Sequence, residues 1–362
     1  MQFAFNEEQQ MFQDAIRGCL QRDVPLTRTR TWAEAGLLGE FDEFSARQGW
    51  PGLGIPEDAG GQGGGMVELA LFFEELGRAA VPSGRLLATT GLALPLMLLG
   101  TGGIEPVARV IEDGAGVAVV VPGGRPVDGM GGEVVLRDHK LHGAVPLVLD
   151  ASDAAFLMVP VRSASGWDLW LLEAGATGAV VTPRRLVDHT RRFADVAFDG
   201  AVAQRIGAVS ADDLSYIAAR VALMVAAESL GLARRMLEMT TAYVKERVQF
   251  GVPVGSFQAV KHAAAEILVD IEAAHSGIYY AAWAMEIRAA DGPLHAWMAK
   301  TFATEAAVRA ADRALFLHGA IGYTWEYDLH YFYKRAKTNL ELFGAPKAYR
   351  DRIADVMELV TN

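Results

Sequence analysis

From residue 212 onward, apolar residues recur every three or four positions, and few Gly or Pro residues interrupt them. This spacing places the apolar side chains on one face of a helix. A chain with several such stretches must bury long helices against one another, which constrains its fold more than any other feature. The pattern predicts long helices at 212–247, 257–290, 294–317 and 346–360.

The beginning of the chain also predicts helices. Residues 7–21 carry apolar side chains at helical spacing, and Asn6 is a suitable N-cap before them. A Gly-rich break follows, and then a second helix at about 67–80. The apolar stretch 86–99 is too short to span a bilayer and predicts a buried core helix, so no membrane is expected as a partner.

Between these regions the sequence changes to short β-rich runs separated by Gly, Pro and Asp, which is typical of strands and turns. The expected strands lie at 117–121, 133–136, 155–161, 169–172, 179–181 and 196–198. The order predicts an α+β fold, mainly α. It has an N-terminal helical domain at 1–104, a middle antiparallel β-domain at 105–208 and a C-terminal four-helix bundle at 209–362.

The composition excludes several classes of protein. The formal net charge is −11, whereas nucleic-acid binders usually present a basic face. Cys19 is the single cysteine, so neither a disulfide framework nor a cysteine-based metal site can form. The first ten residues lack a basic segment followed by an apolar run, so we expect no signal peptide and a cytoplasmic location.

Two short motifs have ordinary structural explanations. The Gly-rich residues 60–65 could cradle a phosphate, but neither G-x-G-x-x-G after a strand nor a P-loop lysine is present, so a tight turn between helices is favoured. His139 and His142 lack a third ligand at suitable spacing and lie in an expected hairpin, which favours a structural role over a metal site. No G-x-S-x-G motif occurs, which disfavours a serine hydrolase.

Residues 247–262 are the most informative segment. A long helix is expected to end at Gly251, and the next to begin near Ser256. Arg247 would then lie in the last helical turn, where a cation favours the helix dipole. On physical grounds alone, a helix cap and a ligand contact remain equally open.

This segment is similar to the helix–turn–helix signature of the acyl-CoA dehydrogenase family. In that family the matching arginine, polar residue, phenylalanine and second-helix glutamine contact an FAD that is bound mainly by the neighbouring subunit. The resemblance therefore implies FAD contacts by Arg247, Gln249, Phe250 and Gln258. An arginine fork suits a pyrophosphate because it offers bidentate, charge-assisted hydrogen bonds.

Two further segments carry the same resemblance. Residues 316–327 resemble the family's glycine turn near the ADP half of the flavin, and the resemblance places Gly319 and Gly322 there. The pattern at 50–65, followed by 74–78, also resembles the family's N-terminal region. The resemblance thus covers nearly the whole chain.

The residue that should carry the family's chemistry is missing. The family oxidises acyl-CoA to 2,3-enoyl-CoA, and a glutamate removes the α-proton while a hydride passes to the flavin. That glutamate comes from one of two places, where this sequence has Phe343 and Val221, and neither side chain accepts a proton. Glu341 lies two residues from the first, and Glu228 lies about 10 Å along a helix from the second, so both are poor substitutes.

The β-domain also departs from the family. The expected Thr-Glu-Pro…Gly-Ser-Asp loop and Trp-Ile-Thr segment align with 121–125 and 144–146, which lack those hydroxyl and aromatic groups. Phe316 stands where a glutamine is usual, and Ala320 replaces a turn glycine. What the chain would supply to its own FAD and acyl-CoA is lost, whereas what it would supply to a neighbour is mostly kept.

The chain therefore resembles the base-lacking subunit of the heterotetrameric α2β2 acyl-CoA dehydrogenases of actinobacterial steroid side-chain degradation. This resemblance implies FAD as cofactor, a second, catalytic subunit that binds most of the acyl-CoA, and an electron-transfer acceptor. Two alternatives stay open. One is a self-sufficient homomeric dehydrogenase whose base is Glu228 or Glu341. The other is a flavin-free interaction protein on the same fold.

Overall fold

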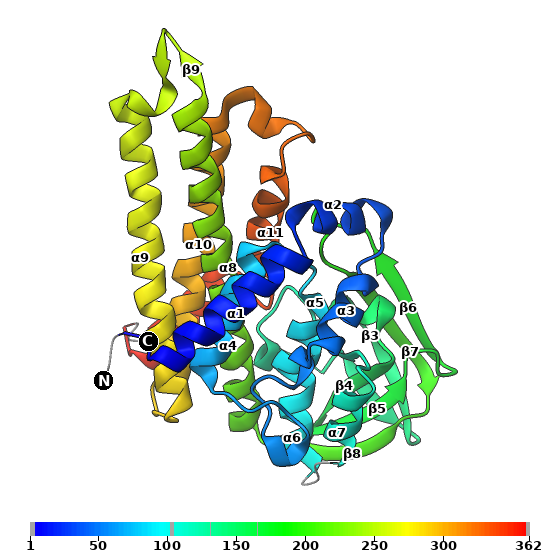
Figure 1. The fold of residues 1–362 in the computed structure, drawn as a ribbon. Coiled ribbons are helices and arrows are strands. Elements are labelled where there is room, and N and C mark those ends of the chain that lie inside the picture. The colour runs from blue at the N-terminus through cyan, green and yellow to red at the C-terminus, as the bar shows by residue number, and fades with distance from the viewer. Residues whose placement is uncertain (1–3, 102–104, 131, 165, 360–362) are drawn as a thin grey trace.

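The computed structural model describes residues 4–101, 105–130, 132–164 and 166–359. N-terminal helices lie against a β-rich part, and long C-terminal helices rise beside both (Figure 1). The expected fold class is confirmed, while the domain limits at 104 and 208 stay predictions. The N-terminal helices are α1 (Glu7–Asp23), α2 (Leu26–Ala35), α3 (Gly39–Arg47), α4 (Met66–Arg78), α5 (Gly84–Leu86), α6 (Leu94–Thr101) and α7 (Glu105–Glu112).

The predicted start of α1 is confirmed in detail. The Asn6 side chain accepts a hydrogen bond from the N–H of Gln9 at 2.8 Å, and the Gln9 side chain accepts one from the N–H of Asn6 at 3.2 Å. This reciprocal capping satisfies two N–H groups that the helix cannot satisfy itself. The apolar stretch at 86–99 is also helical, with a π-helical segment, η3 (Leu87–Ala93), between α5 and α6. Residues 87–97 are buried, as expected of a core helix.

The β-rich part consists of two four-stranded sheets, ordered β1-β4-β5-β8 and β2-β3-β7-β6. Apolar side chains from both sheets, such as Val159 and Val196, form a core between them. The sequence predicts six of these strands but misses β3 and β8. The bounds are β1 (Val117–Val119), β2 (Val134–Arg137), β3 (Lys140–Leu149), β4 (Phe156–Ser163), β5 (Gly166–Glu173), β6 (Ala179–Arg184), β7 (Phe193–Ala201) and β8 (Gln204–Val209).

One strand pair departs from the antiparallel expectation, since β1 runs parallel to β4. The chain passes through β2 and β3 of the other sheet between them, and such a crossover lets two strands run in the same direction. The expected hairpin at His139 and His142 is confirmed, because Asp138 and His139 form the turn between β2 and β3 with φ +48° and +60°. Among the described residues, no group of three His, Cys, Asp or Glu could hold a metal ion.

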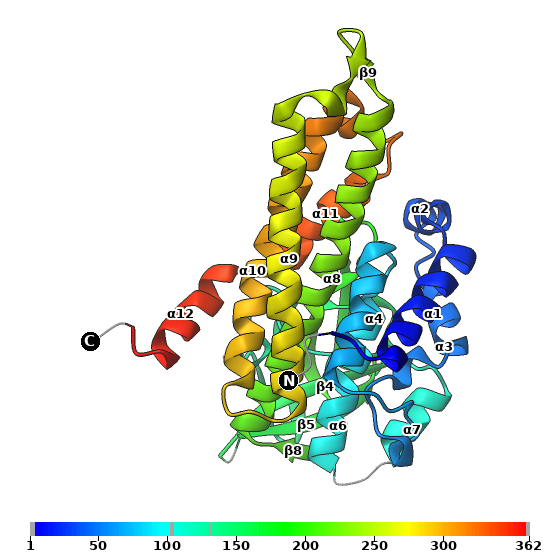
Figure 2. The same ribbon diagram turned by 60° about the vertical axis from the view of Figure 1, so that its left-hand side comes forward.

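The C-terminal part contains α8 (Ala211–Glu246), α9 (Gln258–Glu286), α10 (Gly292–His318), α11 (Leu329–Glu341) and α12 (Pro346–Val356). Figure 2 shows α8, α9 and α10 side by side, while α12 extends away from them. The sequence predicts all of these helices except α11. By length and hydropathy α8 could cross a membrane, but 94% of its apolar window is buried inside the protein, as in a core helix.

Two glycines set the distance between α4 and α8. A Cβ at Gly77 would lie 2.0 Å from the carbonyl oxygen of Glu228, and one at Gly231 would lie 1.9 Å from that of Glu74. Both values are far below van der Waals contact, so only glycine fits at either position. The close approach draws the N-terminal helices onto the middle of α8, next to the candidate base position Val221 and the Glu228 side chain.

Candidate functional site

A two-stranded hairpin joins α8 to α9 at the far end of the bundle (Figure 1). Its strands are β9 (Val248–Gln249) and β10 (Val252–Pro253), which pair antiparallel. Phe250 and Gly251 form the turn, with φ +54° and +79°, as a type I′ hairpin turn requires.

The prediction that the helix continues to Gly251 is wrong, because α8 ends at Glu246. β-Branched valines at 248 and 252 favour an extended backbone, and the pairing of the two strands outweighs one more helical turn. Arg247 follows the last helical turn instead of lying in it. Its N–H donates to the carbonyl of Tyr243 at 2.9 Å, and its φ of −69° and ψ of 120° are extended.

The side chains of this hairpin point into solvent. Phe250 is 92% exposed and meets Phe257 edge to face, with ring centroids 6.2 Å apart. The guanidinium of Arg247 forms no hydrogen bond or ion pair with any described residue. A group of exposed apolar side chains is typical of a surface that meets a partner, and an exposed guanidinium without a partner is free to bind an anion. The structure thus brings together Arg247, Gln249, Phe250 and Gln258 at one end of the bundle.

The second predicted segment lies at the same end. Gly319 follows α10 with φ +63°, and the 3₁₀ turn η7 (Gly319–Tyr323) comes next. Gly322 is buried, and a Cβ there would lie 3.0 Å from the carbonyl oxygen of Leu315. Tyr243 of α8 stacks on His318 of α10 with ring centroids 4.6 Å apart, which fixes the two segments relative to each other.

More aromatic side chains are exposed around this turn. Phe316 is 77% exposed, and Tyr323 and Trp325 are each 69% exposed. We call the exposed residues at this end of the bundle the bundle-end surface: Arg247, Gln249, Phe250, Gln258, Phe316, Tyr323 and Trp325.

Both candidate base positions are fully buried. Val221 is 0% exposed, and a Cβ at Gly91 of η3 would lie only 3.4 Å from its Cγ2, so the core helix covers it. Phe343 is also 0% exposed, and its backbone has φ +54°. Neither position faces a space that the structure leaves open to solvent.

The turn that carries Phe343 is fixed by hydrogen bonds to the loop after β1 and to α12. Its N–H donates to the carbonyl of Gly123 at 2.6 Å, and its own carbonyl accepts from the Tyr349 hydroxyl at 2.7 Å. The ammonium of Lys300 donates to the carbonyl of Gly344 at 2.6 Å. Gly344 also lies so close to Pro126 that a Cβ would come within 2.8 Å of its ring. The loop after β1 is thus closed onto the turn where the family holds its base.

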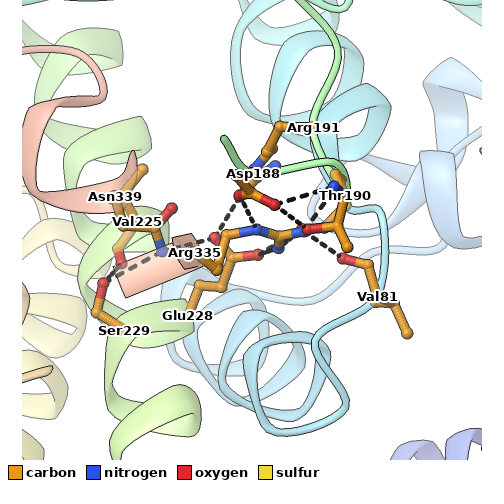
Figure 3. A network of polar contacts seen from close by, with 10 residues as sticks. Val81, Asp188, Thr190, Arg191, Val225, Glu228, Ser229, Arg335 and Asn339 are labelled. Atoms are coloured by element: carbon orange, nitrogen blue, oxygen red, sulfur yellow. Dashed lines mark hydrogen bonds and ion pairs between the residues drawn. The ribbon is translucent and has the colours of Figure 1, made fainter. Parts of the chain in front are cut away.

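Glu228, the first alternative base, is an anion inside a buried polar network (Figure 3). Its Oε1 accepts from Arg335 at 2.8 Å and from the Ser83 hydroxyl, and its Oε2 accepts from Asn339 at 2.9 Å and from Arg191. Burial alone would raise the pKa of the Glu228 carboxyl, but the two guanidinium groups outweigh it and lower that pKa. A carboxylate with four donors and no exposure is not available to remove a substrate proton.

The network extends beyond Glu228. Arg335 also donates to Asp188 at 2.9 Å, to the carbonyl of Val81 at 3.1 Å and to the carbonyl of Thr190 at 3.0 Å (Figure 3). It therefore joins the N-terminal helices, the connection between β6 and β7, α8 and α11. Sequence reasoning missed this network because its members are dispersed along the chain. The one available signal was a polar pair, Arg335 and Asn339, on the apolar face of an amphipathic segment.

Glu341, the second alternative base, is the last residue of α11 and is exposed to solvent. An exposed carboxylate keeps its hydration shell and is not held against a substrate carbon. Neither alternative base therefore lies in a setting suited to proton abstraction.

Family models match two parts of the chain: "Acyl-CoA dehydrogenase, N-terminal domain" at 6–104, and "Acyl-CoA dehydrogenase, C-terminal domain" at 218–358. The chain is 30% identical to acyl-CoA dehydrogenase IpdE2 of Mycolicibacterium smegmatis, covering 96% of this chain and 98% of that protein. It is also similar to the solved structure of the Tcur3481–Tcur3483 steroid ACAD, with a TM-score of 0.85, 28% identity and 98% of both chains covered. The ChsE4–ChsE5 complex from Mycobacterium tuberculosis shares the fold, with a TM-score of 0.85, 23% identity and 100% of both chains covered.

Proposed function

Because the chain belongs to the acyl-CoA dehydrogenase family of oxidoreductases, we propose that it is the non-catalytic subunit of a heteromeric, FAD-dependent acyl-CoA dehydrogenase. The observation that carries this proposal is the burial of both positions where the family holds its base, Val221 and Phe343. A chain with an apolar side chain at each position cannot remove the α-proton of an acyl-CoA. That step falls to a second, catalytic subunit, which also binds most of the acyl-CoA.

The bundle-end surface is the part of this chain that we assign to the cofactor. FAD, when bound, supplies the hydride acceptor. Its pyrophosphate needs a cationic fork, and the exposed, unpaired guanidinium of Arg247 fits that need. Gln249 and Gln258 offer further hydrogen bonds, and the exposed ring of Phe250 offers an apolar contact. Gly319 leaves room for a ligand beside the backbone, since no described atom lies within 4 Å of where its Cβ would be, while Gly322 allows the turn to pack against Leu315 and His318.

The similar structures support a two-subunit assembly. The Tcur3481–Tcur3483 steroid ACAD and the ChsE4–ChsE5 complex are both named for two components. We propose the same arrangement here, with steroid-derived acyl-CoA thioesters as the substrate class, a cytoplasmic location and an electron-transfer acceptor for the reduced cofactor. The exposed rings of the bundle-end surface would be buried when the second subunit binds.

Co-expression with a catalytic acyl-CoA dehydrogenase subunit from the same organism tests the proposal. We expect this chain alone to purify without visible flavin absorption, and the co-purified complex to be yellow, with a single FAD for each heterodimer. The measurements are the absorption spectrum and the acyl-CoA oxidation rate of both samples. A yellow, active preparation of this chain alone would show that the proposed division of labour is wrong.

In the homomeric alternative, Glu341 is one of the two possible bases, so replacing it would remove turnover. Because this carboxylate is exposed to solvent, Glu341→Gln is expected to leave the turnover of the complex unchanged. The measurement is kcat with a steroid-derived acyl-CoA, with the unmodified complex as control. A loss of turnover of about 100-fold or more, as removal of a general base produces, would make Glu341 the base after all.

A further inference from the structure

A cavity lies at the end of α9 that is remote from the bundle-end surface (Figure 1). Gln258 begins α9 beside the hairpin, and Glu286 ends it about 40 Å away along the helix axis. Near Glu286, residues from the starts of α1 and α4 and from α9 together line a cavity of about 410 Å³. This volume is within the range of small-molecule sites, and no residue of the bundle-end surface lines it.

Aromatic rings form much of the wall of this cavity. They belong to Phe5, which precedes α1, and to Tyr279, Tyr280 and Trp283 on α9. The Phe5 and Tyr279 rings meet edge to face, with centroids 4.7 Å and planes 74° apart, and the Tyr280 and Trp283 rings lie 5.8 Å apart at 45°. The Tyr279 hydroxyl donates to Glu74 at 2.6 Å, which fixes its ring. Rings that meet at such angles form a concave wall instead of a flat stack.

The lining of the cavity is negatively charged. Glu286 is the single carboxylate among the described residues that line it, and one of its oxygens accepts from the N–H of Val67 at 3.2 Å. No Lys or Arg in the described part of the chain forms an ion pair with Glu286, and none of those residues lines the cavity. His275 also lines it, but burial and the nearby Arg234 lower the pKa of His275, so its ring is uncharged at pH 7.

This combination selects the class of ligand. An anion would be repelled by Glu286, and a metal ion such as Ca²⁺ needs several oxygen ligands where the lining offers one carboxylate. Aromatic faces attract a cation, above all one whose charge is spread over alkyl groups that also gain from apolar contact. An organic cation therefore satisfies both the rings and the carboxylate.

We propose that this cavity binds an alkylammonium group, with its charge beside Glu286 and its alkyl groups against the rings of Tyr280 and Trp283. The group belongs either to a small molecule in solution or to a side chain of the second subunit, and both sources carry the same chemistry.

Calorimetric titration of the full chain with choline chloride tests the site, with sodium chloride exchanged to keep the ionic strength constant. The matched ligand is 3,3-dimethylbutan-1-ol, which has the shape of choline but carries no charge. We expect choline to bind about tenfold more tightly than this alcohol, since only the cation gains from the ring faces and from Glu286. Tyr280→Leu, at a residue that is 37% exposed, removes one ring without disturbing the core and should narrow that preference to about threefold.

Glu286→Gln removes the charge but keeps an acceptor for the N–H of Val67. It should weaken choline binding about fivefold and leave binding of the alcohol unchanged. Glu272→Gln is the matched control, because it removes the same charge from an exposed position of α9 outside the cavity and should bind choline normally.

In the two-subunit complex, continued choline binding identifies a small molecule as the ligand. Lost binding, together with a Glu286→Gln complex that assembles more weakly, identifies an ammonium group of the second subunit, whereas lost binding with unchanged assembly overturns the proposal. It is also overturned if the chain alone does not bind choline, if it binds choline and the alcohol equally, or if Glu286→Gln binds choline unchanged. The titrations of the chain alone do not depend on its assignment to a heteromeric enzyme.

Discussion

Replacing Arg247 with alanine is expected to weaken FAD binding to the two-subunit complex by on the order of 100-fold, which corresponds to about 2.7 kcal/mol. The side chain is exposed and unpaired in the isolated chain, so its removal leaves the folding of this subunit intact. In the complex, the same guanidinium would contact the pyrophosphate in an enclosed interface, where a charged hydrogen bond is strong. The substitution should therefore lower the affinity of the complex for FAD and leave the free energy of unfolding of this subunit unchanged.

The measurement is FAD content after dialysis, together with a fluorescence titration of the FAD-free complex. Arg247→Lys keeps the charge but loses the fork and should bind FAD with intermediate affinity. Arg205→Ala removes the same charge from the β-rich part and should bind FAD normally. An Arg247→Ala complex with unchanged FAD content would instead favour the flavin-free interaction protein.

Replacing Arg335 with methionine is expected to lower the free energy of unfolding by about 3–5 kcal/mol. Arg335 is 0% exposed, and its loss would leave Asp188 and Glu228 as buried carboxylates with too few donors. The pKa of each carboxyl is held low by the guanidinium groups beside it, despite burial that would raise it. Without Arg335, both groups must either take up a proton or remain as costly buried charges.

Denaturant unfolding followed by circular dichroism measures this effect. Arg309→Met is the matched control, because Arg309 pairs with Asp270 on the surface, where such a pair contributes about 0–1 kcal/mol. Adding Glu228→Gln to Arg335→Met should recover part of the loss, since it removes one of the stranded charges. A loss below about 1 kcal/mol for Arg335→Met would mean that the network contributes no more than a surface pair.

The sequence predicts the parts of this fold whose pattern is local. The periodicity of α8, α9 and α10 fixes their positions to within a few residues, and Asn6 marks the start of α1. α11 was missed because its buried face includes Arg335 and Asn339, which hide its amphipathic pattern. β3 was missed because Gly143 and Pro146 interrupt it, and Leu147 adopts φ +52° at an irregularity in its pairing with β7.

For the candidate site, too, the sequence predicts the local segments but not how the fold brings them together. The resemblance in sequence locates the segments of Arg247 and Gly319, but it does not show that they meet at one end of the bundle. That proximity depends on the antiparallel course of three helices and on the stacking of Tyr243 on His318. Alignment likewise predicts the loss of a base at Val221 and Phe343, whereas the closure of the loop after β1 onto Phe343 follows only from tertiary packing.

If this chain is non-catalytic, as we propose, the closed turn at Phe343 makes that loss hard to reverse. A single mutation from Phe343 to glutamate would not restore a base, because the new carboxylate would enter a fully buried, apolar position that no substrate reaches. The carbonyl of Gly123 and the ring of Pro126 would also have to move away from residues 343 and 344. Return to a self-sufficient enzyme thus needs coordinated changes in two segments that lie more than two hundred positions apart in the sequence. Once such a chain depends on a second subunit, its own packing preserves that dependence.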